Sequence, residues 1–175
     1  MAIKTIFLDR DGVINHEVNY LHKISEFRFI NGIFDACICF KKLGYQIIII
    51  SNQSGIARGY YSEIDYQNLT KWLITQFKQN NITILDTFYC PHSPNAGCKC
   101  RKPEPGMFLE AKAKYNIDMK KSWMIGDKET DIQAAITSGI TKTILVSSGH
   151  SIDNQTSSAL FFLDSIKHAS QVITN

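Results

Sequence analysis

Short apolar runs alternate along the chain with segments whose apolar residues recur at helical spacing. The runs have strand length and cover residues 5–8, 46–50, 85–89, 123–125, 143–146 and, more weakly, 160–163. Runs of strand length that alternate with helical segments are typical of parallel strands in α/β proteins. The pattern therefore predicts an α/β fold, in which one doubly wound parallel sheet carries helices on both faces.

Four helices are expected between these strands. The first ends at Gly44, and the second follows Ser62, a favourable N-cap with Asp65 in its first turn. Pro105 can open the third helix, and the fourth runs from about residue 129 to 139. Their apolar faces are formed by Ile33, Ala36, Cys37, Phe40 and Leu43; by Leu69, Trp72, Leu73 and Phe77; by Phe108, Ala111 and Tyr115; and by Ile132, Ala135 and Ile136.

The composition limits the possible functions. The 175 residues suffice for one domain with a substantial core, and 44% hydrophobic with 20% charged residues is typical of a soluble globular protein. The net charge of +3 is too small to indicate a nucleic-acid tract, and the N-terminus resembles neither a signal peptide nor a membrane span. We expect a single cytoplasmic domain over residues 1–175, monomeric, with no nucleic-acid or membrane partner.

Each polar cluster that can carry chemistry follows a predicted strand. Asp9 and Asp11 follow the first, SNQSGIARG (51–59) the second, CRKPEPG (100–106) comes after the third, and GDKETD (126–131) follows the fourth. In an open, Rossmann-like parallel sheet, such positions converge at the carboxyl ends of the strands. The sequence therefore predicts one polar site built from four distant segments.

Two aspartates at this place suit phosphoryl transfer. Carboxylates, water and phosphate form the oxygen-rich site that magnesium prefers, and the metal offsets the repulsion between aspartate and phosphate. Asp9, when ionised, can attack phosphorus, and Asp11, when protonated, can supply a proton to the leaving oxygen. The hydroxyls and turn-prone backbone amides from Ser51 onward suit phosphate oxygens.

Taken singly, these residues also have plain structural interpretations. The aspartate pair suits a solvated turn, Ser51 a strand-end hydrogen bond, Asp131 the dipole of the fourth helix, and Arg101 with Lys102 surface charge. Four matches at four strand ends favour catalysis over these alternatives.

A second cluster, CPHSPNAGCKC (90–100), offers metal ligands. Cys90, His92, Cys98 and Cys100 form the ligand set of a closed structural zinc site, although one-residue spacing within each pair departs from the generic zinc-finger pattern. Unpaired cysteines in a loop are the alternative. We interpret Cys37 and Cys39 as small apolar residues and assign no role to His16, His22, His150 and His168.

Together, DRDGVIN (9–15), Ser51 with its loop, the Arg101–Lys102 pair and GDKETD resemble, in order, the four signature motifs of the haloacid dehalogenase superfamily of phosphatases. More narrowly, the chain resembles the D-glycero-D-manno-heptose 1,7-bisphosphate phosphatases, which carry the same zinc cluster beside the active site. The resemblance implies removal of the C7 phosphate to give heptose 1-phosphate, a reaction of nucleotide-activated heptose (lipopolysaccharide or surface glycan) biosynthesis.

The resemblance also implies a role for each matching residue. Asp9 is the expected nucleophile, Asp11 the acid/base, and Ser51 and Lys102 steady the phosphoryl group. Magnesium would be held by the side chains of Asp9 and Asp127 and the backbone carbonyl of Asp11. Substrate contacts are expected from Glu17, Asn19, Tyr20, Ser51, Asn52, Gln53, Ser54, Arg101, Lys102 and Lys128.

The connections between the strands leave no room for a cap domain, so segment 17–20 and the zinc loop should form the rim of a capless site.

Three alternative functions stay open. Histidinol-phosphate phosphatases share the five-residue gap between His92 and Cys98. An open site can also admit the 3′-phosphate end of a nucleic acid, and the same fold could serve as a non-catalytic, zinc-stabilised binding module.

Overall fold

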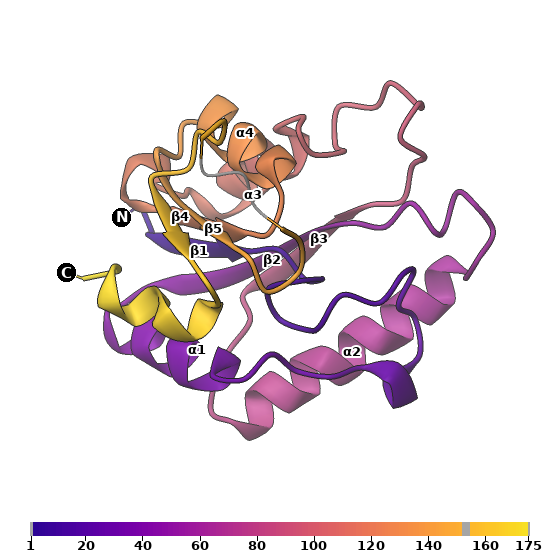
Figure 1. Cartoon of the computed structure of the whole chain (residues 1–175), viewed down its shortest axis with the longest axis horizontal. Coiled ribbons are helices and arrows are strands. Elements are labelled where there is room, and N and C mark those ends of the chain that lie inside the picture. Colours follow the sequence, from indigo (N-terminus) through magenta and orange to yellow (C-terminus); the bar gives the residue numbers. More distant parts are fainter. Residues whose placement is uncertain (1, 152–154, 175) are drawn as a thin grey trace.

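The six strands form one parallel sheet in the order β3-β2-β1-β4-β5-β6 (Figure 1). The computed structural model describes residues 2–151 and 155–174. The strands are β1 (Thr5–Leu8), β2 (Gln46–Asn52), β3 (Asp86–Cys90), β4 (Trp123–Gly126), β5 (Lys142–Val146) and β6 (Phe161–Leu163). The helices are α1 (Ile33–Lys42), α2 (Glu63–Gln79), α3 (Gly106–Tyr115) and α4 (Glu129–Thr137), with the short 3-10 helices η1 (Ile24–Glu26), η2 (Met119–Lys121) and η3 (Ile166–Gln171). The predicted doubly wound α/β fold is confirmed.

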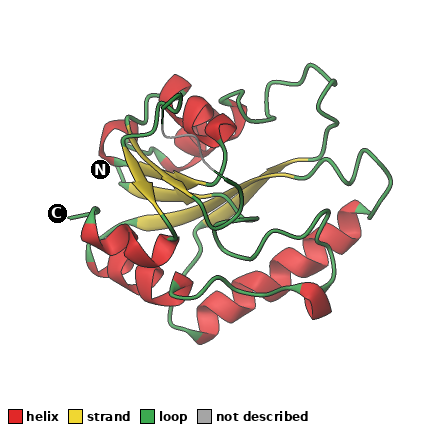
Figure 2. Ribbon diagram, in the orientation of Figure 1, coloured by secondary structure: helices red, strands yellow, loops and turns green. Residues whose placement is uncertain are grey.

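Helices cover both faces of the sheet (Figures 1 and 2): α1, α2 and η3 lie on one face, α3 and α4 on the other. Because successive side chains of a strand point to opposite faces, β1 contributes to two separate cores. Ile6 and Leu8 pack against α1 and α2, whereas Phe7 packs against α3. This explains why the strand is apolar throughout.

The N-cap predicted at Ser62 is confirmed, but one residue predicted on the buried face of a helix is exposed. The Ser62 hydroxyl accepts from the Asp65 backbone N–H at 3.1 Å, and the Asp65 carboxylate accepts from the Ser62 N–H at 2.8 Å, which is a complete capping box. The placement of Ile136 in the core was wrong, since 41% of it is exposed. Helix α4 turns Asp131 inward beside Ile132, so its buried face continues over residues 134 and 135 and leaves Ile136 outside.

The sheet places the site at its topological switch point. Strand β1 lies between β2 and β4, and the connection from β1 leads to β2 whereas the connection from β4 leads the other way, to β5. Connections 9–32 and 53–62 are loops whose only helix is η1, which agrees with the capless prediction. Among the described residues, no helix is long and apolar enough to cross a membrane.

Substituting Phe108 by alanine should lower the free energy of unfolding by about 3–5 kcal/mol, because a fully buried ring would leave a cavity. The ring centroid of Phe108 lies 5.1 Å from that of Phe7, between α3 and the sheet. Urea unfolding measures the loss, and Phe161→Ala, at a residue 37% exposed on β6, is the matched control. Equal losses in the two variants would contradict the assignment of Phe108 to the core.

Candidate active site

A buried cation holds two carboxylates together at the switch point. Lys102 Nζ lies 2.7 Å from Asp9 Oδ1 and 2.6 Å from Asp131 Oδ1, and it donates to the Ile50 carbonyl at 2.9 Å. Asp9 follows β1 directly, and its N–H donates to the Ile125 carbonyl at 3.0 Å, which continues the pairing of β1 with β4. The floor of the site is therefore fixed by the sheet itself.

The floor carries more negative than positive charge. Burial, together with the charges of nearby Asp9 and Asp131, raises the pKa of Asp127 to about 9. Burial also raises the pKa of Asp9 to about 6, although Lys102 acts in the opposite direction. Burial by itself would lower the pKa of Lys102, but Asp131 and Asp9 raise it above its ordinary value. Lys102 thus pairs with two of three neighbouring buried carboxylates and leaves Asp127 without a lysine or arginine partner among the described residues.

This excess of carboxylates fits a divalent cation. One oxygen from each of Asp9, Asp127 and Asp131 lies within 4.8 Å of the others. Asp127 Oδ1 is buried and has no hydrogen-bond partner among the described residues, and an unpaired buried carboxylate oxygen is costly. Oxygen ligands of this kind suit magnesium. Asp131, interpreted above as a complement to the helix dipole, also forms the ion pair with Lys102.

The side chain of Asp11 is held by several donors of its own. Arg10 Nε and Nη2 donate to its two oxygens at 2.9–3.2 Å, and Asn15 Nδ2 donates at 2.9 Å. Gln53 Nε2 adds a longer contact of 3.3 Å. Asp11 nevertheless lines the cavity described next.

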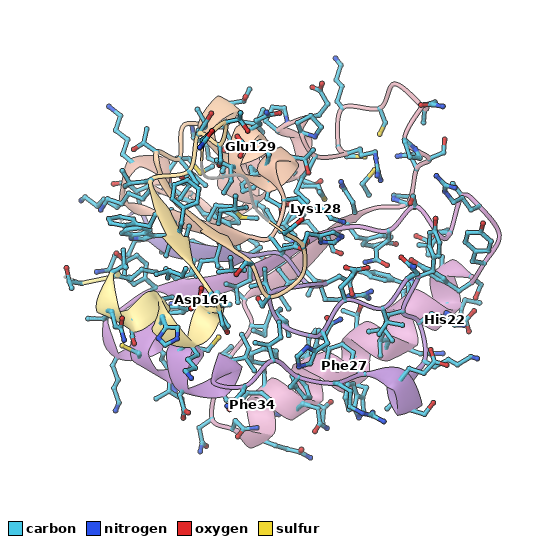
Figure 3. The ribbon with its side chains drawn as sticks, in the orientation of Figure 1. His22, Phe27, Phe34, Lys128, Glu129 and Asp164 are labelled. Carbon is cyan, nitrogen blue, oxygen red and sulfur yellow. The ribbon has the colours of Figure 1, made fainter. Side chains whose placement is uncertain are left out.

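A cavity of about 770 Å³ opens above the floor. Every residue expected to contact substrate lines it: Glu17, Asn19, Tyr20, Ser51, Asn52, Gln53, Ser54, Arg101, Lys102 and Lys128. Figure 3 shows Lys128 at the start of α4. Burial, together with the charge of Asp11, raises the pKa of Glu17 to about 7. The sequence thus identified residues from four segments that the fold brings together.

Two of these side chains already have partners within the protein. Asn52 bridges to the backbone of Lys102, accepting from its N–H and donating to its carbonyl, both at 3.1 Å. Gln53 donates to Ser51 Oγ at 2.6 Å and accepts from the Tyr61 hydroxyl at 2.5 Å. These contacts position Lys102 and Ser51, the residues expected to hold the phosphoryl group.

The second cluster of ligands also converges. The sulfur atoms of Cys90, Cys98 and Cys100 lie 3.0–3.6 Å apart, and His92 Nδ1 lies 3.2–3.5 Å from two of them. Tetrahedral zinc with bonds of about 2.3 Å to sulfur separates its ligands by about 3.8 Å, which is near the two longer sulfur spacings of 3.6 Å and longer than the shortest, 3.0 Å. Cys98 also lines the cavity, so the cluster borders the site.

Sequence reasoning missed two contacts of the site. Arg10 was not assigned a function, and His150 was given no role, yet His150 Nδ1 lies 2.5 Å from Asp127 Oδ2. Residues 127 and 150 follow the adjacent strands β4 and β5, so only knowledge of the strand order could have connected them. For Arg10 the signal was its place between two aspartates of a strand-end motif.

Comparisons with known proteins identify a class of relatives for the chain. A HAD-hydrolase-like family model matches residues 99–169. The D-glycero-alpha-D-manno-heptose-1,7-bisphosphate 7-phosphatase of Photorhabdus laumondii is 49% identical, over 90% of each chain. The corresponding beta enzyme of Vibrio cholerae is 43% identical, over 95% of this chain and 94% of that one. The D,D-heptose 1,7-bisphosphate phosphatase of B. bronchiseptica, solved with magnesium and phosphate, is 27% identical and superposes with a TM-score of 0.84 over 97% of both chains.

Fold, site and relatives define a haloacid dehalogenase-like phosphatase, and the chain belongs to the family of the D-glycero-D-manno-heptose-1,7-bisphosphate 7-phosphatases.

Asp127→Asn should stabilise the metal-free protein. The folded-state pKa of Asp127, about 9, lies above its ordinary value of 3.8, so the folded state binds the proton more tightly. The stability of the wild type should therefore fall as pH rises from about 4 to 9. The asparagine variant carries an uncharged amide at this position, so its stability should not fall for this reason. In chelator at pH 8, we expect a gain of at least about 1 kcal/mol in urea unfolding. A variant less stable than the wild type would contradict the proposed charge excess.

Proposed function

We propose that the whole chain acts as a single phosphatase domain, which removes the C7 phosphate of D-glycero-D-manno-heptose 1,7-bisphosphate and leaves heptose 1-phosphate. The carrying observation is the buried cluster of Asp9, Lys102, Asp127 and Asp131, of which all but Asp127 line a cavity that further cations also line. The names of the relatives support this substrate. Its product would then enter the synthesis of nucleotide-activated heptose.

In this mechanism a carboxylate oxygen of Asp9 attacks phosphorus, and the bond between phosphorus and the C7 oxygen breaks. Asp11 gives its proton to that oxygen, so heptose 1-phosphate leaves as an alcohol. Water then attacks the aspartyl phosphate while Asp11 takes a proton, which releases inorganic phosphate and restores Asp9. Lys102 holds Asp9 Oδ1 at 2.7 Å and thereby fixes the orientation of the nucleophile.

Magnesium would be held by the side chains of Asp9 and Asp127 and the carbonyl of Asp11, with Asp131 beside them, and would offset the phosphate charge. Ser51, which is buried and receives a hydrogen bond from Gln53, stands ready to donate its hydroxyl proton to a phosphoryl oxygen. The floor can therefore accommodate one phosphate with its charge compensated on two sides.

The rim suits a second phosphate. Lys99, Arg101 and Lys128 line the cavity and form no ion pair with another described residue. Arg101 Nη1 is buried without a hydrogen-bond partner, and a guanidinium can grip phosphate with two parallel hydrogen bonds. A primary phosphate on an extended arm can reach Asp9, while the sugar ring and the C1 phosphate stay at the rim.

The alpha anomer is the better-supported substrate. The relative named for the alpha anomer is 49% identical, whereas the enzyme of the same organism named for the beta anomer is 42% identical over a similar length. We therefore expect the alpha bisphosphate to be hydrolysed more efficiently than the beta.

Cytoplasmic location, the monomeric state and the absence of nucleic-acid binding stay predictions.

Asp9→Asn should abolish turnover and leave the fold intact, since an amide is a poor nucleophile and a weaker metal ligand. Asp11→Asn should lose about 10²–10⁴-fold with the sugar substrate, through loss of proton transfer, and less with p-nitrophenyl phosphate, whose leaving group needs no proton. Phosphate release measures both, with circular dichroism as the control for folding. Near-normal activity of Asp9→Asn would end the aspartyl-phosphate mechanism.

The purified protein should contain about one zinc per chain when it is prepared without chelator. Cys98→Ser should lose zinc and raise KM more than it lowers kcat, because Cys98 borders the cavity whereas Asp9 is fixed by the sheet. Cys39→Ser, outside the cluster, is the matched control, and elemental analysis gives the metal content. A zinc-free wild type would contradict the assignment.

Arg101→Ala should reduce kcat/KM for the heptose bisphosphate far more than for a monophosphate, because only the bisphosphate uses the rim. Arg28→Ala, whose guanidinium bonds to nearby loop carbonyls, is the matched control. The substrates are both anomers, histidinol phosphate and a 3′-phosphate oligonucleotide, with phosphorus NMR to identify the remaining phosphate. Better turnover of histidinol phosphate, or loss of the C1 phosphate, would overturn the substrate assignment and leave the phosphatase chemistry standing.

A further inference from the structure

The two carboxylate oxygens of Asp127 have different surroundings. Oδ2 lies 2.5 Å from His150 Nδ1 and is enclosed by Gly12 and Gly149, where an added Cβ would lie 2.2 Å and 2.1 Å from it. Oδ1 is buried without a hydrogen-bond partner among the described residues. One oxygen is therefore fixed by the protein, and the other is left for a ligand.

The fold brings His150 to this position from a separate segment. Strands β4 and β5 are paired neighbours, with Gly126 opposite Leu145, so the loops that follow them run side by side. The loop after β5 is also tied to the loop after β1, because Ser148 Oγ donates to the Gly12 carbonyl at 2.6 Å. His150 thus approaches Asp127 on a segment held at two neighbouring strand ends.

We propose that His150 is a positioning residue for the cation site: its Nδ1–H donates to Asp127 Oδ2 and thereby presents Oδ1 to the metal. The inference rests on the cation site of the proposed function. A donor that fixes one oxygen of a metal-binding carboxylate sets the direction of the other, and the loss of such outer contacts typically costs 10–100-fold in metal affinity.

An alternative is that His150 binds a metal itself, since ligand atoms of Glu17, Asp127 and His150 lie within 4.8 Å of one another. Two observations argue against it. Two ligands of one ion at right angles, each about 2.1 Å from it, would be about 3 Å apart, more than the 2.5 Å observed. Gly12 and Gly149 also leave little room beside Oδ2 for a further ion.

The test measures binding of Mn²⁺ alone to the zinc-loaded enzyme, by electron paramagnetic resonance without substrate. His150→Ala removes the donor, whereas His150→Asn places an amide N–H near the position of Nδ1. His168→Ala, at a half-buried histidine in η3 far from the cation site in the sequence, is the matched control. The His150 side chain is 41% exposed, so its removal should not unfold the protein, and circular dichroism in chelator checks this.

We expect His150→Ala to raise the Kd for Mn²⁺ about 10–100-fold, with His150→Asn restoring most of the affinity and His168→Ala without effect. The Mg²⁺ concentration for half-maximal activity should shift in parallel, while kcat at saturating Mg²⁺ changes much less. Unchanged affinity in His150→Ala, or equal weakening in the alanine and asparagine variants, would overturn the inference. A wild type that binds no Mn²⁺ would instead contradict the cation site itself.

Discussion

The buried ammonium of Lys102 is the interaction on which the site depends. Removing a carboxylate from water costs several kcal/mol, and the fold buries Asp9, Asp127 and Asp131 close together. Lys102 compensates two of them directly, with ion pairs of 2.7 Å and 2.6 Å. Because it supplies a single charge, the cluster stays negative as a whole. The same imbalance that makes the floor costly to fold makes it suited to a divalent cation.

The position of Lys102 depends in turn on contacts far away in sequence. It lies in the irregular connection from β3 to α3, where no helix or strand fixes the backbone. Asn52, at the end of β2, holds that backbone with two hydrogen bonds. Cys98 and Cys100 of the Cys/His cluster lie four and two residues before Lys102, so a metal bound to that cluster would shorten the free length of the loop. The hydrogen bonds of Asn52, and a metal at the Cys/His cluster when one is bound, thus position the ammonium group of Lys102 at the edge of the sheet.

The parts of the structure that were predicted from the sequence are those with local causes. Strand β1 and the Ser62 capping box follow from the apolar run and from side chains three residues apart. The four motifs converge because strand ends in a parallel sheet meet at one edge. Ile136 was placed wrongly because the inward turn of Asp131, which Lys102 attracts, shifts the buried face of α4. His150 was missed because its contact with Asp127 depends on the pairing of β4 with β5, and neither segment's sequence indicates that pairing.

The division between floor and rim explains where specificity can reside. Asn52 and Gln53 line the cavity, but their side chains are hydrogen-bonded within the protein, to Lys102, Ser51 and Tyr61. Their role is therefore to hold the residues around the phosphoryl site in position relative to the strands. Arg101 and Lys128, by contrast, form no ion pair with another of the described residues. Rim residues can therefore change with the size and charge of the sugar while the floor is kept. A phosphatase of this fold can therefore acquire a new substrate through changes in the loop that carries the Cys/His cluster, without disturbing the buried carboxylates at the ends of the strands.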